Sequence, residues 1–153
     1  NLTAVAIGKS VTSIKDNAFY LCKALKSINI PDNVLVIGDY VFRDSGLTEA
    51  IIGSGITSIG LESFDDCSKI YCKANTPPAI SASYDANSNI YGSFGYKSGN
   101  IEIYVPSQAY DLYTQYTSPK LKTNHQANWA IYNDKIVAYD FENNIEISAN
   151  NAL

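Results

Sequence analysis

Seven apolar positions recur at the same offsets in three consecutive segments of this chain, and this repetition limits what the chain can fold into. The segments begin at Leu2, Leu25 and Leu47, and the next apolar start is Ile70, so the spacings are 23, 22 and 23 residues. A regular period of this length is typical of solenoids, in which a unit buries its apolar side only against the next unit. Each segment also carries one phenylalanine at the same offset: Phe19, Phe42 and Phe64.

Each repeat contains two extended stretches and one turn. In the first stretch of the second repeat, apolar Ile28 and Ile30 alternate with Ser27 and Asn29, which is the pattern of a strand with one buried face. We expect this stretch to form a strand in all three repeats, and these strands to pair as a parallel sheet. A second stretch precedes the turn that carries the phenylalanine, so the three rings should stack as an aromatic column.

The outward positions of the predicted sheet carry small or weakly polar side chains in the three repeats. These positions are Ala4, Ala6, Ser27, Asn29, Glu49 and Ile51. Because no line of aromatic or like-charged side chains occurs among them, we expect at most a shallow binding surface on this face.

The repeat pattern fails after Ile70. Lys73 occupies a position that should be apolar, and Pro77-Pro78 should end the strand ladder, because proline lacks an N–H and restricts the residue before it. We therefore assign residues 1–75 to the repeats. Residues 81–100 are rich in Ser, Asn, Gly and Tyr and are interpreted as a surface excursion.

The following segment has the pattern of a cap. A strand is predicted at 101–106, a short helix at 109–116 with Ser107 as its N-cap, and a helical piece around Trp129 ahead of a strand at 137–141. Since the last apolar face of a solenoid must be covered, residues 76–141 are predicted to form a C-terminal α+β cap. Residues 142–153 are interpreted as a tail.

Composition excludes several classes of partner. The chain is 46% hydrophobic and 17% charged, with a net charge of −4 and a pI near 4.8, which argues against nucleic-acid binding. No stretch approaches the roughly 18 apolar residues of a membrane span.

The chain opens inside a repeat and lacks Met, so we expect any secretion signal to lie outside it. The N-terminal edge, with Leu2, Val5 and Ile7, predicts further repeats upstream or self-association.

The sequence offers no convincing catalytic or metal site, and no cofactor is predicted. His125 is the single histidine and lies in a polar stretch, where a solvated loop residue is expected. Glu62, Asp65 and Asp66 could in principle serve glycoside hydrolysis, but a solvated corner is the favoured interpretation. Residues 85–89 copy the first three ligand positions of a calcium loop and then depart from it, so a surface turn is expected.

The three cysteines are interpreted as small core residues. Cys22 and Cys67 occupy the same position two repeats apart, which places them about 10 Å apart if strands stack at ~4.8 Å, and such a pair cannot be bridged. Ser45 takes the intervening position. A bridge between Cys67 and Cys72 is geometrically possible, with two buried thiols as the favoured alternative.

Tyrosine is unusually frequent towards the C-terminus: nine of the twelve tyrosines lie from Tyr84 onward. Tyr and Trp join a flat apolar face to a polar tip, which suits interfaces and sugar rings as well as cores. Packing in the cap is the favoured interpretation for Tyr104, Tyr113 and Trp129. Candidates for a ligand-contact patch are three tyrosines flanked by Asn, Ser and Gly: Tyr84, Tyr91 and Tyr96.

These residues together resemble the BspA-type leucine-rich repeat proteins of bacterial cell surfaces. The resemblance lies in residues 11–14 with 17–19, in 36–42, and in 56–60 with Phe64 and Cys67. It continues through 72–78 and 103–107, then Tyr113, Trp129 and Ile136, which look like the terminal module of many such proteins. Departures are Lys15 in place of Gly, Ser45 in place of Cys, and an insertion at 117–128.

The resulting prediction is an α/β protein: a right-handed leucine-rich repeat solenoid of about three coils with a parallel sheet and the C-terminal cap. The resemblance implies a secreted or surface-exposed protein of gut- or mouth-dwelling anaerobes, adhesin-like and without catalytic residues. We therefore expect a non-enzymatic scaffold that binds a protein or glycan at a host or neighbouring-cell surface. The alternative is a carbohydrate-binding accessory module of a surface glycan-utilisation system, which the tyrosines of residues 81–100 favour.

Overall fold

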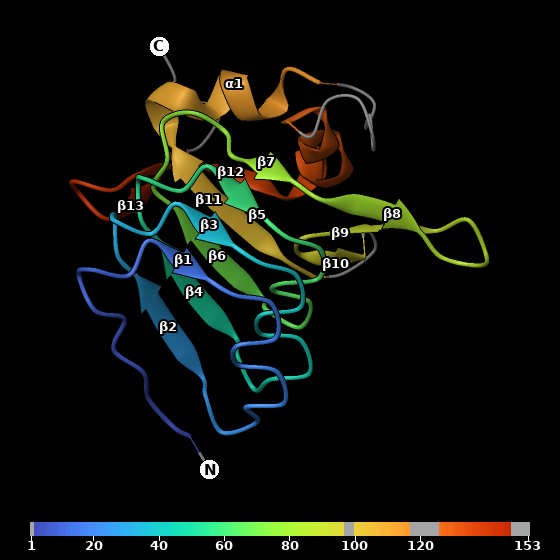
Figure 1. Ribbon diagram of the computed structural model, residues 1–153. Helices are drawn as coiled ribbons and strands as arrows, with labels where there is room; N and C mark the ends of the chain where they lie inside the picture. Colours follow the sequence, from blue (N-terminus) through green and yellow to red (C-terminus); the bar gives the residue numbers. More distant parts are fainter. Residues whose placement is uncertain (1, 97–99, 117–125, 148–153) are drawn as a thin grey trace.

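The computed structural model describes residues 2–96, 100–116 and 126–147, and the strands within these ranges form three sheets (Figure 1). The largest is a six-stranded sheet with the order β13-β12-β11-β6-β4-β2. All of its neighbours pair in parallel except β12 and β13. Its strands are β2 (Ser27–Ile30), β4 (Glu49–Ile52), β6 (Lys69–Cys72), β11 (Glu102–Pro106), β12 (Ile136–Asp140) and β13 (Ile145–Glu146).

A second parallel sheet has four short strands in the order β1-β3-β5-β7. These strands are β1 (Ser13–Ile14), β3 (Val36–Ile37), β5 (Ser58–Ile59) and β7 (Ala79–Ile80). The third sheet is antiparallel and joins β8 (Ala82–Tyr84), β9 (Ile90–Gly92) and β10 (Gly95–Tyr96). In Figure 1 the connection between β8 and β9 projects sideways from the body of the molecule.

The parallel register places equivalent apolar side chains above one another. Ile28 pairs with Ala50, Ala50 with Ile70, and Ile70 with Ile103. All four are buried, with Ala50, Ile70 and Ile103 at 0% exposure. The core is therefore built by successive strands covering one another, as the repetition predicts.

The strand predicted in the first repeat does not form. Residues 2–7 have no strand assignment, and β2 is the edge strand of the six-stranded sheet within the described residues. Val5 and Ile7 still pack against the core as half-buried side chains. The other side chains of residues 2–7 are exposed, so little apolar burial offsets the loss of backbone freedom that a strand would require.

The predicted register of the fourth segment is also wrong. Ile70 was aligned with Leu47, but it pairs with Ala50, three positions further along. Cys67 consequently takes the place equivalent to Leu47, and the corner between Phe64 and β6 is shorter than the corner between Phe42 and β4. The apolar pattern could not reveal this shorter corner, because Cys67 and Ile70 are both apolar and either could be aligned with Leu47.

The ladder continues beyond Pro77-Pro78, contrary to the expectation that these prolines would end it. Ala79 N–H donates to the Thr57 carbonyl at 2.9 Å and Ser81 N–H to the Ile59 carbonyl at 3.2 Å. The prolines lie just before β7, where their missing N–H groups remove no bond of the ladder. The division of the chain at residue 75 remains a prediction about sequence pattern.

The phenylalanine rings form a continuous stack. Phe19 and Phe42 have ring centroids 5.2 Å apart, as have Phe42 and Phe64. A fourth ring, Phe94, follows Phe64 at 6.0 Å and contacts Trp129 at 5.4 Å. Residues 81–100 are therefore more than a surface excursion, because Phe94 is 2% exposed and belongs to the core.

Three short helical elements follow β11: η1 (Ser107–Ala109), α1 (Tyr110–Thr114) and η2 (Gln126–Lys135). Ser107 is the first residue of η1 and not an N-cap; the cap position is Pro106, and no side chain bonds there. Trp129 Nε1 donates to the Pro78 carbonyl and Asn128 Nδ2 to the Ile80 carbonyl, both at 2.8 Å, which ties η2 to β7.

The first part of the predicted tail is ordered as a hairpin. β13 pairs antiparallel with β12, and Ile147 N–H donates to the Ala138 carbonyl at 2.8 Å. The Asp140 carboxylate accepts the N–H groups of Glu142 and Asn143, which forms the turn. Residues 148–153 of the tail lie outside the described residues.

Candidate ligand-binding surfaces

The antiparallel sheet of β8, β9 and β10, which we call the β8–β10 hairpin, brings together two of the three predicted contact tyrosines. Tyr91 pairs with Tyr96 across β9 and β10, and their ring centroids are 5.5 Å apart. Tyr84 pairs with Ile90, one residue out of phase with Tyr91, so it lies on the opposite face of this small sheet. Tyr84 is 54% exposed and Tyr96 43% exposed. Whether these tyrosines contact a ligand remains a prediction.

Acidic groups lie near Tyr96, where Asp65 and Asp66 line the same small hollow and Glu62 acts on the phenol. Glu62 is buried and pairs with Arg43 at 2.9 Å, while the Arg43 guanidinium lies 5.3 Å from the centre of the Tyr40 ring. Burial raises the pKa of Glu62, and the charge of Arg43 opposes part of this rise. Partial burial raises the pKa of Asp65, with the neighbouring Asp66 adding to the rise. Glu62 is therefore a buried, ion-paired side chain and not part of the solvated corner expected from the sequence, whereas Asp65 and Asp66 line a hollow of about 210 Å³ together with Tyr96.

A second aromatic surface lies on the outward face of the six-stranded sheet, where the small and weakly polar side chains of the first three repeats predict only a shallow surface. We call it the sheet-face cluster, and its members are Tyr71, Tyr104, Tyr139 and Phe141. The Tyr71 and Tyr104 rings stack at 4.6 Å with planes 11° apart. Tyr139 meets both edge-on, at 5.5 Å from Tyr71 and 5.4 Å from Tyr104. Phe141 meets Tyr139 at 4.9 Å.

Strand register creates this cluster. Ile51 pairs with Tyr71, and Tyr71 pairs with Tyr104, so three strands place these side chains side by side on the same face. Tyr139 follows one pleat further along β12, opposite Pro106. Strands β4, β6 and β11 come from distant parts of the chain. The outward positions of the first three repeats therefore do not reveal the cluster. The alternation of Lys69-Ile70-Tyr71 and of Glu102-Ile103-Tyr104 was the available signal.

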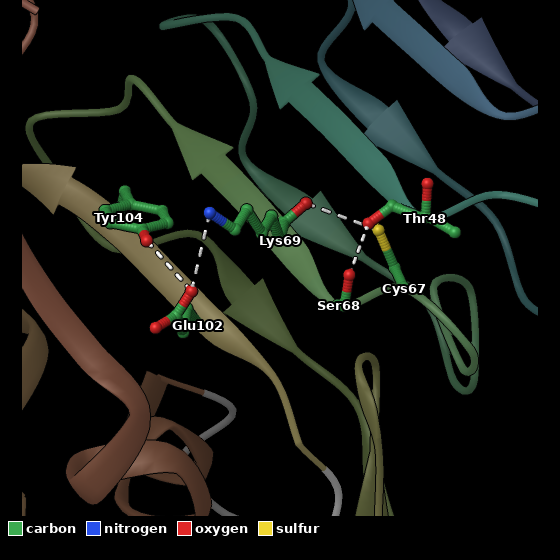
Figure 2. Close-up of polar contacts among 6 residues, drawn as sticks. All are labelled: Thr48, Cys67, Ser68, Lys69, Glu102 and Tyr104. Atoms are coloured by element: carbon green, nitrogen blue, oxygen red, sulfur yellow. Dashed lines mark hydrogen bonds and ion pairs between the residues drawn. The ribbon is translucent and has the colours of Figure 1, made fainter.

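Polar contacts link Tyr104 to Glu102 and Glu102 to Lys69, as Figure 2 shows. Tyr104 Oη donates to Glu102 Oε2 at 2.9 Å, and Lys69 Nζ lies 3.8 Å from the same carboxylate oxygen. Nearby, Ser68 Oγ and the Lys69 N–H both donate to the Thr48 carbonyl. Tyr104 was expected in the cap core; it is buried instead beneath its aromatic neighbours on the sheet face.

Burial, together with nearby carboxylates, raises the pKa of Tyr104 and of Tyr71. Burial raises the pKa of Tyr104 far above its ordinary value, and its hydrogen bond to Glu102 adds to the rise. Burial also raises the pKa of Tyr71; Lys69 opposes the rise, and the Glu49 and Glu146 carboxylates add to it. The cluster therefore presents neutral aromatic surface with carboxylates close by.

A hollow of about 330 Å³ lies beside the sheet-face cluster. Its lining residues come from β4, β6, β12 and the turn after β12: Glu49, Ile51, Tyr71, Lys73, Tyr139, Phe141 and Asn144. The size falls within the lower range of small-ligand sites, and the lining combines apolar surface with a few polar groups. Three aromatic side chains line this hollow, whereas the hollow of about 360 Å³ beside β3, β5 and β7 has no aromatic residue in its lining.

The remaining features considered in the sequence are the calcium-like turn at 85–89, metal ligands, His125 and membrane-spanning helices. The Asp85 carboxylate accepts N–H groups of Asn87 and Asn89 within its own turn. Among the described residues, no three His, Cys, Asp or Glu side chains group as metal ligands. His125 lies outside the described residues. None of the helices in the described ranges has the length and apolarity to cross a membrane.

The cysteines are all free thiols, so neither Cys22 and Cys67 nor Cys67 and Cys72 are bridged. Cys72 is buried with its Sγ 3.4 Å from Tyr113 Oη. Cys67 is buried, whereas Cys22 and Phe19, at the outer end of the stack, are half-buried. Trp129 is 0% exposed and packs edge-on against Tyr113 at 4.8 Å.

The repeats and their stacked parallel strands have a counterpart among known families. The family model described as a BspA type leucine rich repeat region (6 copies) matches residues 1–90. This chain belongs to the BspA-type leucine-rich repeat family. The match continues past residue 75 through β7, where the parallel ladder also continues, and through β8 of the antiparallel sheet. A comparison with curated proteins gave no match.

Proposed function

We propose that this BspA-type protein is a non-enzymatic, adhesin-like scaffold, secreted or displayed at the bacterial cell surface, that binds a macromolecular partner. In this proposal the repeats form a right-handed solenoid of about three coils, and residues 76–141 cap it. The partner is a protein or glycan of a host or neighbouring cell. Membership of a family associated with bacterial surface proteins supports this function.

The observation that carries the proposal is the sheet-face cluster with its hollow. Aromatic side chains are concentrated on the outward face of the parallel sheet, and Tyr71 and Phe141 there are half-buried and still reach solvent. Aromatic residues are enriched at protein interfaces because they offer large contact area at a low cost in side-chain entropy.

A binding assay on intact protein tests this function. Immobilised mucin and extracellular-matrix proteins should retain the wild-type chain, and Phe141→Ala should reduce retention at least severalfold. Leu112→Ala is the matched control, because Leu112 is a comparably exposed apolar residue (46%) on α1, outside the hollow. Absence of binding to the whole panel would argue against the adhesin-like function.

Carbohydrate binding is the second candidate function, in an accessory module of a surface glycan-utilisation system. The exposed tyrosines of the β8–β10 hairpin and the mixed lining of the hollow both favour it. Calorimetry against a polysaccharide panel tests it: heat of binding that disappears in Tyr91→Ala or Tyr96→Ala would assign the sugar contact to the hairpin. Flat titrations across the panel would remove this candidate.

Self-association through the N-terminal edge is a separate part of the proposal. β2 and β1 are edge strands of their sheets within the described residues, and Leu2 is 43% exposed. Edge strands with apolar neighbours are templates for pairing with a second chain. Light scattering should show a concentration-dependent dimer that Leu2→Lys weakens; a monomer at every concentration would exclude this mode.

A further inference from the structure

We propose that the hollow beside the sheet-face cluster binds one ring of a neutral oligosaccharide. This inference rests on the carbohydrate-binding candidate above and deepens it, because it moves the primary sugar contact from the hairpin to the sheet. It commits to a pyranose ring packed against Tyr71 and Phe141, with its hydroxyl groups bonded to the polar lining.

Tyr71 and Ile51 are cross-strand neighbours, and both line the hollow. Tyr104 on β11 stacks on the side of the Tyr71 ring away from Ile51, at 4.6 Å, so the half-buried Tyr71 and Ile51 together offer the apolar surface for this contact. Phe141, set at 64° to Tyr139, adds an aromatic wall at an angle. The C–H groups of a pyranose ring pack well on such surfaces, because the aromatic face is electron-rich and the C–H edges are weakly positive.

Polar groups of complementary kinds line the same hollow. The Glu49 carboxylate can only accept hydrogen bonds, the Lys73 ammonium can only donate them, and the Asn144 amide can do both. Asn144 is held in place: its backbone has φ 58°, and its Oδ1 accepts a 2.8 Å bond from Tyr139 Oη. Sugar hydroxyls both donate and accept, so this set matches them without requiring a charge on the ligand.

The geometry disfavours a bound ammonium group. The ring centroids in the cluster lie 4.6–5.5 Å apart, so the rings touch one another and leave no space for a cation between them. Aromatic cages for quaternary ammonium ions require the rings to surround the ion. The ligand must therefore lie on the aromatic surface.

Charge disfavours an acidic sugar. The negative groups near the cluster outnumber the positive ones. The negative groups are the carboxylates of Glu49, Glu102 and Glu146, and the positive groups are the ammonium groups of Lys69 and Lys73. A uronate carboxylate would meet this excess of negative charge at close range. A neutral hexose avoids the repulsion and keeps the stacking and hydrogen bonds.

The test uses the intact chain and defined probes. Cellohexaose, laminarihexaose, maltohexaose and mannohexaose are titrated by calorimetry and saturation-transfer NMR, with oligogalacturonate as the acidic probe. At least one neutral probe should bind, and both Tyr71→Ala and Phe141→Ala should weaken it tenfold or more. Leu112→Ala, outside the hollow and the β8–β10 hairpin, should leave the affinity within twofold. Because Tyr71→Ala also removes a stacking partner of Tyr104, Glu49→Gln provides a milder variant, with an expected loss of several-fold.

The other outcomes separate this inference from the proposed functions. Sugar binding that Tyr96→Ala abolishes and Phe141→Ala leaves intact would overturn the sheet-face site while keeping carbohydrate binding. Tighter binding of oligogalacturonate than of every neutral probe would overturn the neutral-ligand assignment. Failure of all sugars would overturn both the inference and the carbohydrate candidate, and retention on the mucin and matrix panel would still decide the adhesin-like function.

Discussion

At the scale of single residues, the phenylalanine stack shows how one side chain per repeat links the layers. Phe42 has a ring neighbour on each side at 5.2 Å, whereas Phe19 has one ring neighbour within the described residues. Gly60 allows the same close stacking in the backbone, because a Cβ there would collide with the carbonyl group of Gly38 in the preceding repeat. Lys15 takes the corresponding place in the first repeat. Within the described residues no preceding repeat packs against it, so a side chain fits there.

Removing a ring from the middle of this stack should be costly. Phe42→Ala leaves a cavity at a side chain that is 1% exposed, and we expect a loss of about 3–5 kcal/mol in the free energy of unfolding. Phe19→Ala should cost clearly less, because Phe19 is half-buried. Urea denaturation followed by circular dichroism measures both. Equal losses would contradict a stack in which the outer layer is less well packed.

Burial should also separate the three thiols by reactivity. Burial raises the pKa of Cys67 to about 12 and also raises the pKa of Cys72, so neither forms a thiolate at neutral pH. In native protein at pH 7.5, a thiol-specific chromogenic reagent should therefore react quickly with half-buried Cys22 alone. Cys22→Ser should abolish this fast phase, and unfolding in guanidinium should release all three thiols of the wild type. A fast phase that persists in Cys22→Ser would contradict the burial of the other two.

At the scale of elements, the sequence predicts best the strands whose apolar pattern recurs from repeat to repeat and is buried in the structure. The alternation in Ser27–Ile30 and Glu49–Ile52 corresponds to β2 and β4, and the second extended stretch corresponds to β1, β3 and β5. Prediction fails where partners decide the outcome. Residues 2–7 have the alternation but lack a strand, and Ala79–Ile80 forms β7 because β5 offers its carbonyl groups.

The sheet-face cluster could be predicted only in part for the same reason. Alternation indicates that Tyr71 and Tyr104 each point away from the core, yet it cannot show that β6 and β11 are neighbours. That pairing brings together residues 33 positions apart across the hairpin segment, and the contact with Tyr139 adds a third distant strand. The hairpin tyrosines were easier to single out, because Asn, Ser and Gly flank them in sequence, but Tyr84 turns to the opposite face.

One hydroxyl group joins α1 to the strand layer. Tyr113 Oη donates to the Ala74 carbonyl at 2.8 Å, and Tyr113 is 0% exposed. Tyr113→Phe leaves that carbonyl without its donor in a buried place, so we expect a loss of about 1–3 kcal/mol in the free energy of unfolding. Tyr84→Phe, at a 54% exposed side chain, should change stability by less than about 0.5 kcal/mol. Chemical denaturation of both variants gives the comparison, and equal effects would contradict a structural role for this bond.

At the scale of the whole molecule, one stack of strands supports two different surfaces. The outward face of the six-stranded sheet carries the sheet-face cluster, and the antiparallel β8–β10 hairpin carries Tyr91 and Tyr96. Both depend on repeats that cover one another, because Phe94 joins the phenylalanine stack directly after β9. A change that loosens the stack should therefore disturb the hairpin before it disturbs local contacts within the sheet-face cluster.

A layered stack also predicts graded protection of backbone amides. Gly38 N–H donates to Ile14 in the outer layer at 2.9 Å, whereas Gly60 N–H donates to Ile37 at 2.8 Å, between two layers that are each covered on both sides. Because nearest-neighbour contacts dominate such stacks, the outer layer should open more often than the inner ones. Hydrogen exchange followed by NMR should show Gly38 at least tenfold less protected than Gly60, a difference of about 1.4 kcal/mol in opening free energy. Phe19→Ala should widen the gap, because the Phe19 ring stacks on Phe42 and its loss loosens the contact between the first two layers, while Tyr84→Phe should leave the gap unchanged. Uniform protection of both amides would instead indicate one cooperative unit that unfolds as a whole.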